Sequence, residues 1–125
     1  MPLCVAAGAL ALTLAAESFT LAWTHSIEKI RWEEDWRIAA GKLHLHEARV
    51  RGSGAGMEPP QGAVLRAGVW HYHPGREPVD ELLLAHSPYA APYELCLPGK
   101  CAPLDRWLEG LAGTATISLR PCPTR

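Results

Sequence analysis

The stretch THSIEK, residues 24–29, places an imidazole, a hydroxyl and a carboxylate within four positions. If the apolar alternation of FTLAW continues, His25 points inward, where it could be a general base, a metal ligand or a hydrogen-bonded core histidine. Ser26 would point to the opposite face, so the two do not form a nucleophile pair. The chain also has no G-x-S-x-G motif. The segment therefore predicts acid–base or hydrogen-bonding chemistry at His25, Ser26 and Glu28.

Glu34 stands out within WEEDW, residues 32–36. Strand alternation puts it on the same face as Trp32 and Trp36, whereas the other charged residues of the segment share the opposite face. A carboxylate on a buried face needs a partner. The candidate partners are His25, Lys29, Arg37 and the backbone amides of the glycine-rich segment that follows. The alternative is an edge position at which Glu34 reaches water.

A third candidate is RVRGSGAGME, residues 49–58, which has Gly52, Gly54 and Gly56 at alternate positions. Pro59 and Pro60 follow directly, so no helix starts here and a dinucleotide fingerprint is excluded. The glycines could adopt positive φ, form a bulge or expose amides to an anion. Glu58 argues against an anionic ligand, and a conformational role is the preferred interpretation.

Histidines and cysteines raise the question of metals. His44 and His46, and likewise His71 and His73, are spaced to share a strand face and would bind zinc or copper if a third ligand joined them. Solvent-facing histidines are the default interpretation, and no metal or other cofactor is predicted. The cysteines, Cys4, Cys96, Cys101 and Cys122, lack paired zinc-knuckle spacing. Cys96 and Cys101 flank a Pro-Gly turn, so they could bridge a hairpin in an oxidising compartment and would stay reduced in a cytoplasm.

These residues must be positioned mainly by strands. Short alternating segments separated by turn residues run through the chain: FTLAW, IRWEEDWRI, GKLHLHEARV, AVLR, VWHYH, DELLLAHS, APYELCL and TATISLR. Turns are expected at Gly41–Lys42, Ala67–Gly68 and Pro98–Gly99. PLDRWLEGLAG has apolar residues at helical spacing. We therefore predict one all-β domain over 1–125, an antiparallel sandwich or rolled sheet with one short helix near the C-terminus.

The GKLHLHEARV segment has a simple alternation. It places Leu43, Leu45, Glu47 and Arg49 on one face and His44, His46 and Val50 on the other.

The composition argues against nucleic acid and membrane as partners. The formal net charge is -1 and the pI about 6.6, so there is no basic surface for nucleic acid and no sign of membrane insertion. The apolar start, MPLCVAAGALALTLAAES, lacks a positive leading region, and we interpret it as a retained first strand containing Leu12 and Leu14. Without a clear export signal, a cytoplasmic location is favoured over a periplasmic one.

Taken together, FTLAWTHSIEKIRWEEDWRI and EARVRGSGAGMEPP resemble the small bacterial domain of unknown function 1850. The family pattern is an apolar alternation ending in HS-[VI]-E-K, a glutamate before an aromatic residue, and Gly-Ala-Gly followed by proline. The matching positions here are His25, Ser26, Glu28, Lys29, Glu34, Gly54, Ala55, Gly56 and Pro59. The resemblance implies no established activity, but it implies an association with TRAP transporters of the TAXI type, tripartite solute importers that use an extracytoplasmic binding protein.

Three functions are compatible with these residues. The preferred one is a non-enzymatic accessory or ligand-binding domain whose centre comprises His25, Ser26, Glu28, Glu34, Gly54, Gly56 and Glu58, with a TAXI-type transporter component or a small ligand as partner. The second is a small hydrolase- or lyase-like enzyme using His25 with Glu34 or Glu28 as an acid–base pair. The third is a metal-binding module built from the strand histidines.

Overall fold

The computed structural model describes residues 2–24, 30–51 and 61–123, and within them the chain forms eleven strands and one short helix. In chain order the elements are β1 (Leu3–Ala7), β2 (Leu10–Leu14), β3 (Ser18–Thr24), β4 (Arg31–Ala39), β5 (Lys42–Arg51), β6 (Val64–Arg66), β7 (Val69–Tyr72), β8 (Leu82–His86), β9 (Glu94–Leu97), β10 (Lys100–Pro103), α1 (Leu104–Trp107) and β11 (Ala115–Pro121). The predicted all-β class with a short C-terminal helix is confirmed. No helix among these residues is long and apolar enough to span a membrane.

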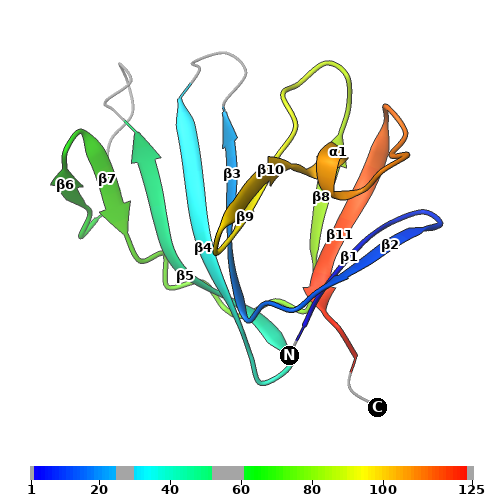
Figure 1. The fold of residues 1–125 in the computed structure, drawn as a ribbon. Helices are drawn as coiled ribbons and strands as arrows, with labels where there is room; N and C mark the ends of the chain where they lie inside the picture. The colour runs from blue at the N-terminus through cyan, green and yellow to red at the C-terminus, as the bar shows by residue number, and fades with distance from the viewer. Residues whose placement is uncertain (1, 25–29, 52–60, 124–125) are drawn as a thin grey trace.

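The strands form two antiparallel sheets (Figure 1). The smaller sheet has the order β2-β1-β11-β8, and the larger has the order β10-β9-β3-β4-β5-β7-β6. The apolar N-terminal stretch supplies β1 and β2, a hairpin turning at Gly8, rather than one strand. Leu12 and Leu14 lie in β2, as predicted.

The hydrophobic core lies between the two sheets because each contributes alternate apolar residues to it. Leu3 and Val5 of β1 and Ile117 and Leu119 of β11 are fully buried on the smaller sheet. They pack in one cluster with residues of the larger sheet that include Phe19, Leu21, Trp36 and Leu95. Each sheet therefore has one mainly apolar inner face, and the larger sheet carries most of its charged residues on its outer face.

A β-bulge in the pairing of β4 with β5 changes which residues of β5 face the core. Asp35 lies opposite Glu47, but Trp36 lies opposite Leu45, so His46 is an extra residue. Leu45 therefore stays on the inner face while Glu47 moves to the outer face. The predicted simple alternation along β5 is wrong beyond this point, because the inserted residue reverses every later side chain.

One turn and the helix differ in detail from the predictions. The hairpin between β4 and β5 turns at Ala40 and Gly41, both at positive φ, one residue earlier than expected. The Ala67–Gly68 and Pro98–Gly99 turns connect the predicted hairpins. The helix has a single turn, from Leu104 to Trp107, because Leu108 already has extended backbone geometry.

All four cysteines are paired. Cys4 bridges Cys122 between the start and the end of the described chain, and Cys96 bridges Cys101 across the β9–β10 hairpin. The hairpin pairing that the turn residues made possible is therefore present in the structure.

Candidate functional site

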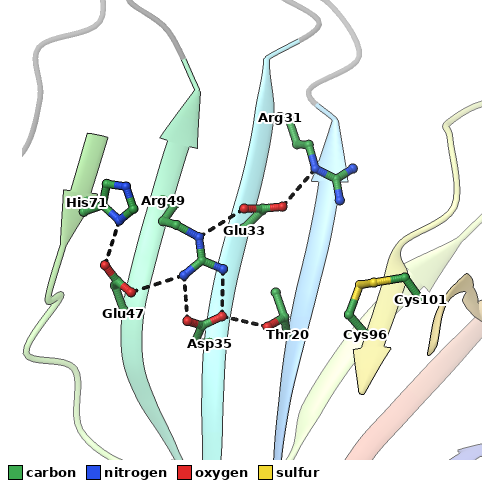
Figure 2. A network of polar contacts seen from close by, with 9 residues as sticks. All are labelled: Thr20, Arg31, Glu33, Asp35, Glu47, Arg49, His71, Cys96 and Cys101. Carbon is green, nitrogen blue, oxygen red and sulfur yellow. Dashed lines mark hydrogen bonds and ion pairs between the residues drawn. A yellow bond between two sulfur atoms is a disulfide. The ribbon is translucent and has the colours of Figure 1, made fainter. Parts of the chain in front are cut away.

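A network of ion pairs covers the outer face of the larger sheet (Figure 2). We call it the polar network and define it as Thr20, Arg31, Glu33, Asp35, Glu47, Arg49, His71 and Glu94. Arg49 is its centre. The guanidinium binds Asp35 with two nitrogens, at 2.6 and 2.8 Å, and also donates to Glu33 at 3.0 Å and to Glu47 at 3.2 Å. Such a fork-shaped contact fixes geometry as well as charge.

The network extends to both sides of Arg49. Glu33 accepts from Arg31 at 3.1 Å, and Arg31 also reaches Glu94 of β9 at 2.6 Å. On the other side, Glu47 lies 2.9 Å from Nδ1 of His71 on β7. The network thereby connects the neighbouring strands β9, β3, β4, β5 and β7 through their side chains as well as their backbones.

Strand register explains why these residues meet. One row across the sheet places Glu33 of β4 beside Arg49 of β5, which lies beside His71 of β7. In the next row Thr20 of β3 lies beside Asp35, and its hydroxyl donates to that carboxylate at 2.7 Å. Opposite charges at cross-strand positions attract each other, and the bulge brings Glu47 and Arg49 onto the same face as the acids of β4.

The network shifts the ionisation of its members. The hydrogen bonds from Arg49 hold the pKa of Asp35 below its ordinary value, against the opposing effect of burial. Burial also opposes ionisation of Glu33, but hydrogen bonds from Arg49 and Arg31 outweigh it, so its pKa is lowered too. The pKa of Arg49 is raised mainly by its hydrogen bonds to Asp35. These groups stay charged at neutral pH.

A groove of about 330 Å³ adjoins the polar network. Its lining includes Thr20 and Asp35 of the network, the exposed Arg37, His46 at the bulge, and Cys96 of the hairpin disulfide. The groove therefore offers a polar surface with both signs of charge next to a covalently fixed hairpin.

Glu34 lies apart from the network, on the inner face. It is half-buried, and its Oε1 accepts a hydrogen bond of 3.2 Å from the indole N–H of Trp36. Burial raises its pKa, while that hydrogen bond and the charge of Arg76 partly offset the effect. Burial and the charge of Glu34 also raise the pKa of Tyr72, which lies in the same row across β4, β5 and β7.

The predicted partners of Glu34 require a correction. Arg37 lies on the opposite, exposed face, because an odd number of positions separates it from Glu34 on the strand. Trp36 supplies the described hydrogen bond, although sequence reasoning treated it only as an apolar neighbour. His25, Lys29 and the glycine-rich segment lie outside the described residues.

Of the predicted site residues, the structure places only Glu34. The others, His25, Ser26, Glu28, Gly54, Gly56 and Glu58, lie outside the described residues. The flanking strands do have a clear relation: β3 ends at Thr24, β4 begins at Arg31 and β5 ends at Arg51, side by side at one end of the sheet (Figure 1). The two segments carrying the predicted centre thus join the sheet at neighbouring positions.

The strand histidines do not form a metal cluster within the described residues. His71 contacts Glu47, and His44 and His73 contact the carbonyl oxygens of Ala39 and His46. The rings of His46 and His73 approach each other edge to face, with 5.7 Å between centroids. His46, the extra residue of the bulge, lines the groove beside the polar network together with Arg37, the cross-strand neighbour of His44.

The polar network was missed from the sequence. The charged face of β4 was recognised, but Glu47 and Arg49 were assigned to the opposite side of the next strand. The alternation of acids and arginines in IRWEEDWRI, followed by EAR one hairpin later, is a signal that could have indicated cross-strand pairing.

Two packed antiparallel sheets, two disulfides and a charged outer face define a small β-sandwich protein. The chain belongs to the family described as Domain of unknown function (DUF1850), whose sequence profile matches residues 19–104. That span runs from β3 to the start of α1 and includes the whole polar network. No curated protein and no solved structure shows a significant match.

Proposed function

We propose that this chain is a non-enzymatic accessory or ligand-binding β domain associated with TAXI-type TRAP solute transport. The observation that carries the proposal is that the charged groups of the outer face satisfy one another. Arg49 alone holds three carboxylates, and no buried side-chain nitrogen or oxygen of the described residues lacks a hydrogen-bond partner. A preorganised, internally satisfied surface suits recognition, whereas acid–base catalysis needs a group free to exchange its proton.

The two disulfides support an oxidising compartment as the place of action. Disulfides persist outside the cytoplasm and are rare within it. The pairing of all four cysteines supports the proposal of an extracytoplasmic location. This location fits an association with importers whose binding protein is extracytoplasmic.

The recognition centre that we propose comprises His25, Ser26, Glu28, Glu34, Gly54, Gly56 and Glu58. Support comes from the common end of β3, β4 and β5, to which both segments connect, and from the half-buried carboxylate of Glu34 on the same sheet. The groove beside the polar network gives the same sheet a second polar surface for a partner.

One observation favours an enzymatic alternative. The raised pKa of Glu34 brings this carboxyl group closer to the range in which a general acid or base works. In that case His25 with Glu34 or Glu28 would form an acid–base pair acting on a small polar substrate.

The direct test is co-purification from the native host. The tagged full chain, extracted without reductant, should enrich a TAXI-type transporter component. His25→Ala and Glu34→Ala should reduce that enrichment more than Glu81→Ala, which lies just before β8 of the smaller sheet. A solute-binding protein of an unrelated transporter serves as the negative control. Failure of the wild-type chain to enrich the component, together with an empty chain in native mass spectrometry, would refute the proposal.

A further inference from the structure

A second pocket, distinct from the polar network, lies between the two sheets. Its volume is about 320 Å³, and its walls come from Trp23 and Thr24 at the end of β3, from residues 85–86 at the end of β8, and from residues 87 and 90–93 between β8 and β9. This volume is at the small end of the range for ligand pockets and suits a single ring.

Two aromatic side chains give the pocket flat walls of fixed orientation. Trp23 stacks on Trp32 of the neighbouring strand, with 6.3 Å between ring centroids and planes 4° apart. Tyr93 meets Trp23 at 5.7 Å with a tilt of 53°. Trp23 is therefore held from two directions, and little conformational entropy remains to be lost when a ring packs against it.

Hydrogen-bonding groups surround these walls. His86 follows Leu84 by two residues on β8, so it shares the inner face with that core residue. Within the described residues, the imidazole of His86 and the hydroxyls of Tyr93 and Thr24 have no hydrogen bond to another side chain or to the backbone. They are available to a ligand that carries hydroxyl groups.

Among the residues that the structure describes, none that lines this pocket is Asp, Glu, Lys or Arg. A charged ligand would lose its hydration there without gaining a paired charge, which is unfavourable. Resting on the ligand-binding role proposed above, we propose that this pocket binds an uncharged solute with one ring and at least one hydroxyl group. A phenol and a monosaccharide share this chemistry, because both offer a ring face to Trp23 and a hydroxyl group to His86 or Tyr93.

Isothermal titration calorimetry of the full chain tests the inference. The probes are phenol and methyl α-D-glucopyranoside as the two sources of the shared chemistry, and 4-hydroxybenzoate as an anionic comparator. One of the neutral probes should bind at least about tenfold more tightly than the anion, and which one binds identifies the source. Equal binding of the anion, or no heat from either neutral probe up to about 10 mM, where even millimolar affinity would register, would overturn the inference.

Variants localise the binding. Tyr93→Phe removes only a hydroxyl and should weaken binding by about two- to tenfold, whereas Tyr89→Phe, at a tyrosine 92% exposed outside the lining, should leave it unchanged. Trp23→Leu should weaken binding by about tenfold or more. Chemical denaturation checks its folding, and His86→Ala provides a second lining variant if Trp23→Leu does not fold. Unchanged affinity in folded lining variants would also refute the site.

The inference and the proposed function can fail separately. Enrichment of a TAXI-type component without binding of either neutral probe would remove the ring site and leave the accessory role intact. Probe binding that depends on Tyr93, without enrichment of a transporter component, would remove the transport association instead.

Discussion

Trp36 performs two structural tasks at once. Its side chain is 1% exposed within the core cluster, and its indole N–H donates to the half-buried carboxylate of Glu34 two residues earlier on the same strand face. A buried indole needs a polar partner, and a carboxylate on an apolar face needs a donor. Each side chain therefore supplies the hydrogen-bond partner that the other needs.

The two tryptophans that flank Glu34 should differ in their contribution to stability. Trp36→Ala should lower the free energy of unfolding by about 3 to 5 kcal/mol, because it empties a core site and leaves Glu34 without its donor. Trp32→Ala should cost less, because Trp32 is only partly buried. Urea denaturation measures both. Equal losses, or a larger loss for Trp32→Ala, would contradict the assigned burial.

The effect of Glu34 on stability depends on pH in the opposite direction from that of Asp35 and Glu33, whose pKa values are lowered. Its folded pKa is raised by burial, so the folded state binds this proton more tightly than the unfolded state does, and stability from this group is lost as pH rises through the folded pKa. Glu34→Gln keeps an acceptor for Trp36 and should therefore be slightly more stable than the wild type at pH 7.

The measurement is urea denaturation of Glu34→Gln and the wild type from pH 4 to pH 7. Their difference in unfolding free energy should grow with pH in favour of the variant. A variant that loses stability relative to the wild type as pH rises would show that the ionised carboxylate is stabilising.

At the scale of the elements, the polar network connects β9, β3, β4, β5 and β7. Arg49 is 18% exposed at its side chain, so its ion pairs are screened less than fully exposed ones. Arg49→Gln should lower the free energy of unfolding by roughly 1 to 3 kcal/mol at pH 7, because three carboxylates each lose one of their partners. Arg49→Lys should recover part of this loss, since it keeps the charge but not the fork.

The same network predicts a pH dependence. Asp35 and Glu33 have lowered folded pKa values, so their contribution is present above their ordinary values of 3.8 and 4.5 and is lost as pH falls through the folded values. The difference between wild type and Arg49→Gln should therefore shrink in acid. A difference that is constant from pH 7 to pH 2 would mean that the network contributes by packing alone.

The β4–β5 hairpin carries a local strain that can be removed. Ala40 has φ of 53°, a left-handed conformation that costs an alanine roughly 1 kcal/mol, and Gly41 follows at 74°. Ala40→Asn should raise the free energy of unfolding by about 0.5 to 1 kcal/mol. Gly41→Ala is the opposite control and should lower it. A destabilised Ala40→Asn variant would argue against this turn geometry.

At the scale of the whole molecule, the two disulfides should contribute unequally. Cys4–Cys122 spans a sequence separation of 118, whereas Cys96–Cys101 spans 5. Loop-closure entropy gives about 5 kcal/mol for the long bridge and about 2 kcal/mol for the short one. Chemical denaturation of the Cys4→Ala/Cys122→Ala and Cys96→Ala/Cys101→Ala double variants tests this order. A larger loss from the hairpin pair would show that loop length does not govern the effect here.

The sequence by itself determined the fold class and most elements. Alternating apolar residues with turn residues between them predicted β3, β4, the hairpins of β6 with β7 and of β9 with β10, and the helix at Leu104, because these depend on neighbours along the chain. The same alternation correctly put Trp36 and Ile38 inside and Arg37 outside. The alternation could not predict the β-bulge, because nothing in GKLHLHEARV marks His46 as an extra residue.

Only the tertiary structure decided which side chains meet across strands. The bulge, the polar network around Arg49, the hydrogen bond from Trp36 to Glu34 and the pairing of Cys4 with Cys122 all depend on register or on sheet packing. A shift of one residue in register reverses the faces of a strand, and that choice is made by the total burial of both sheets rather than by any single segment. For the same reason the sequence indicated Glu34 as a candidate but could not name its partner.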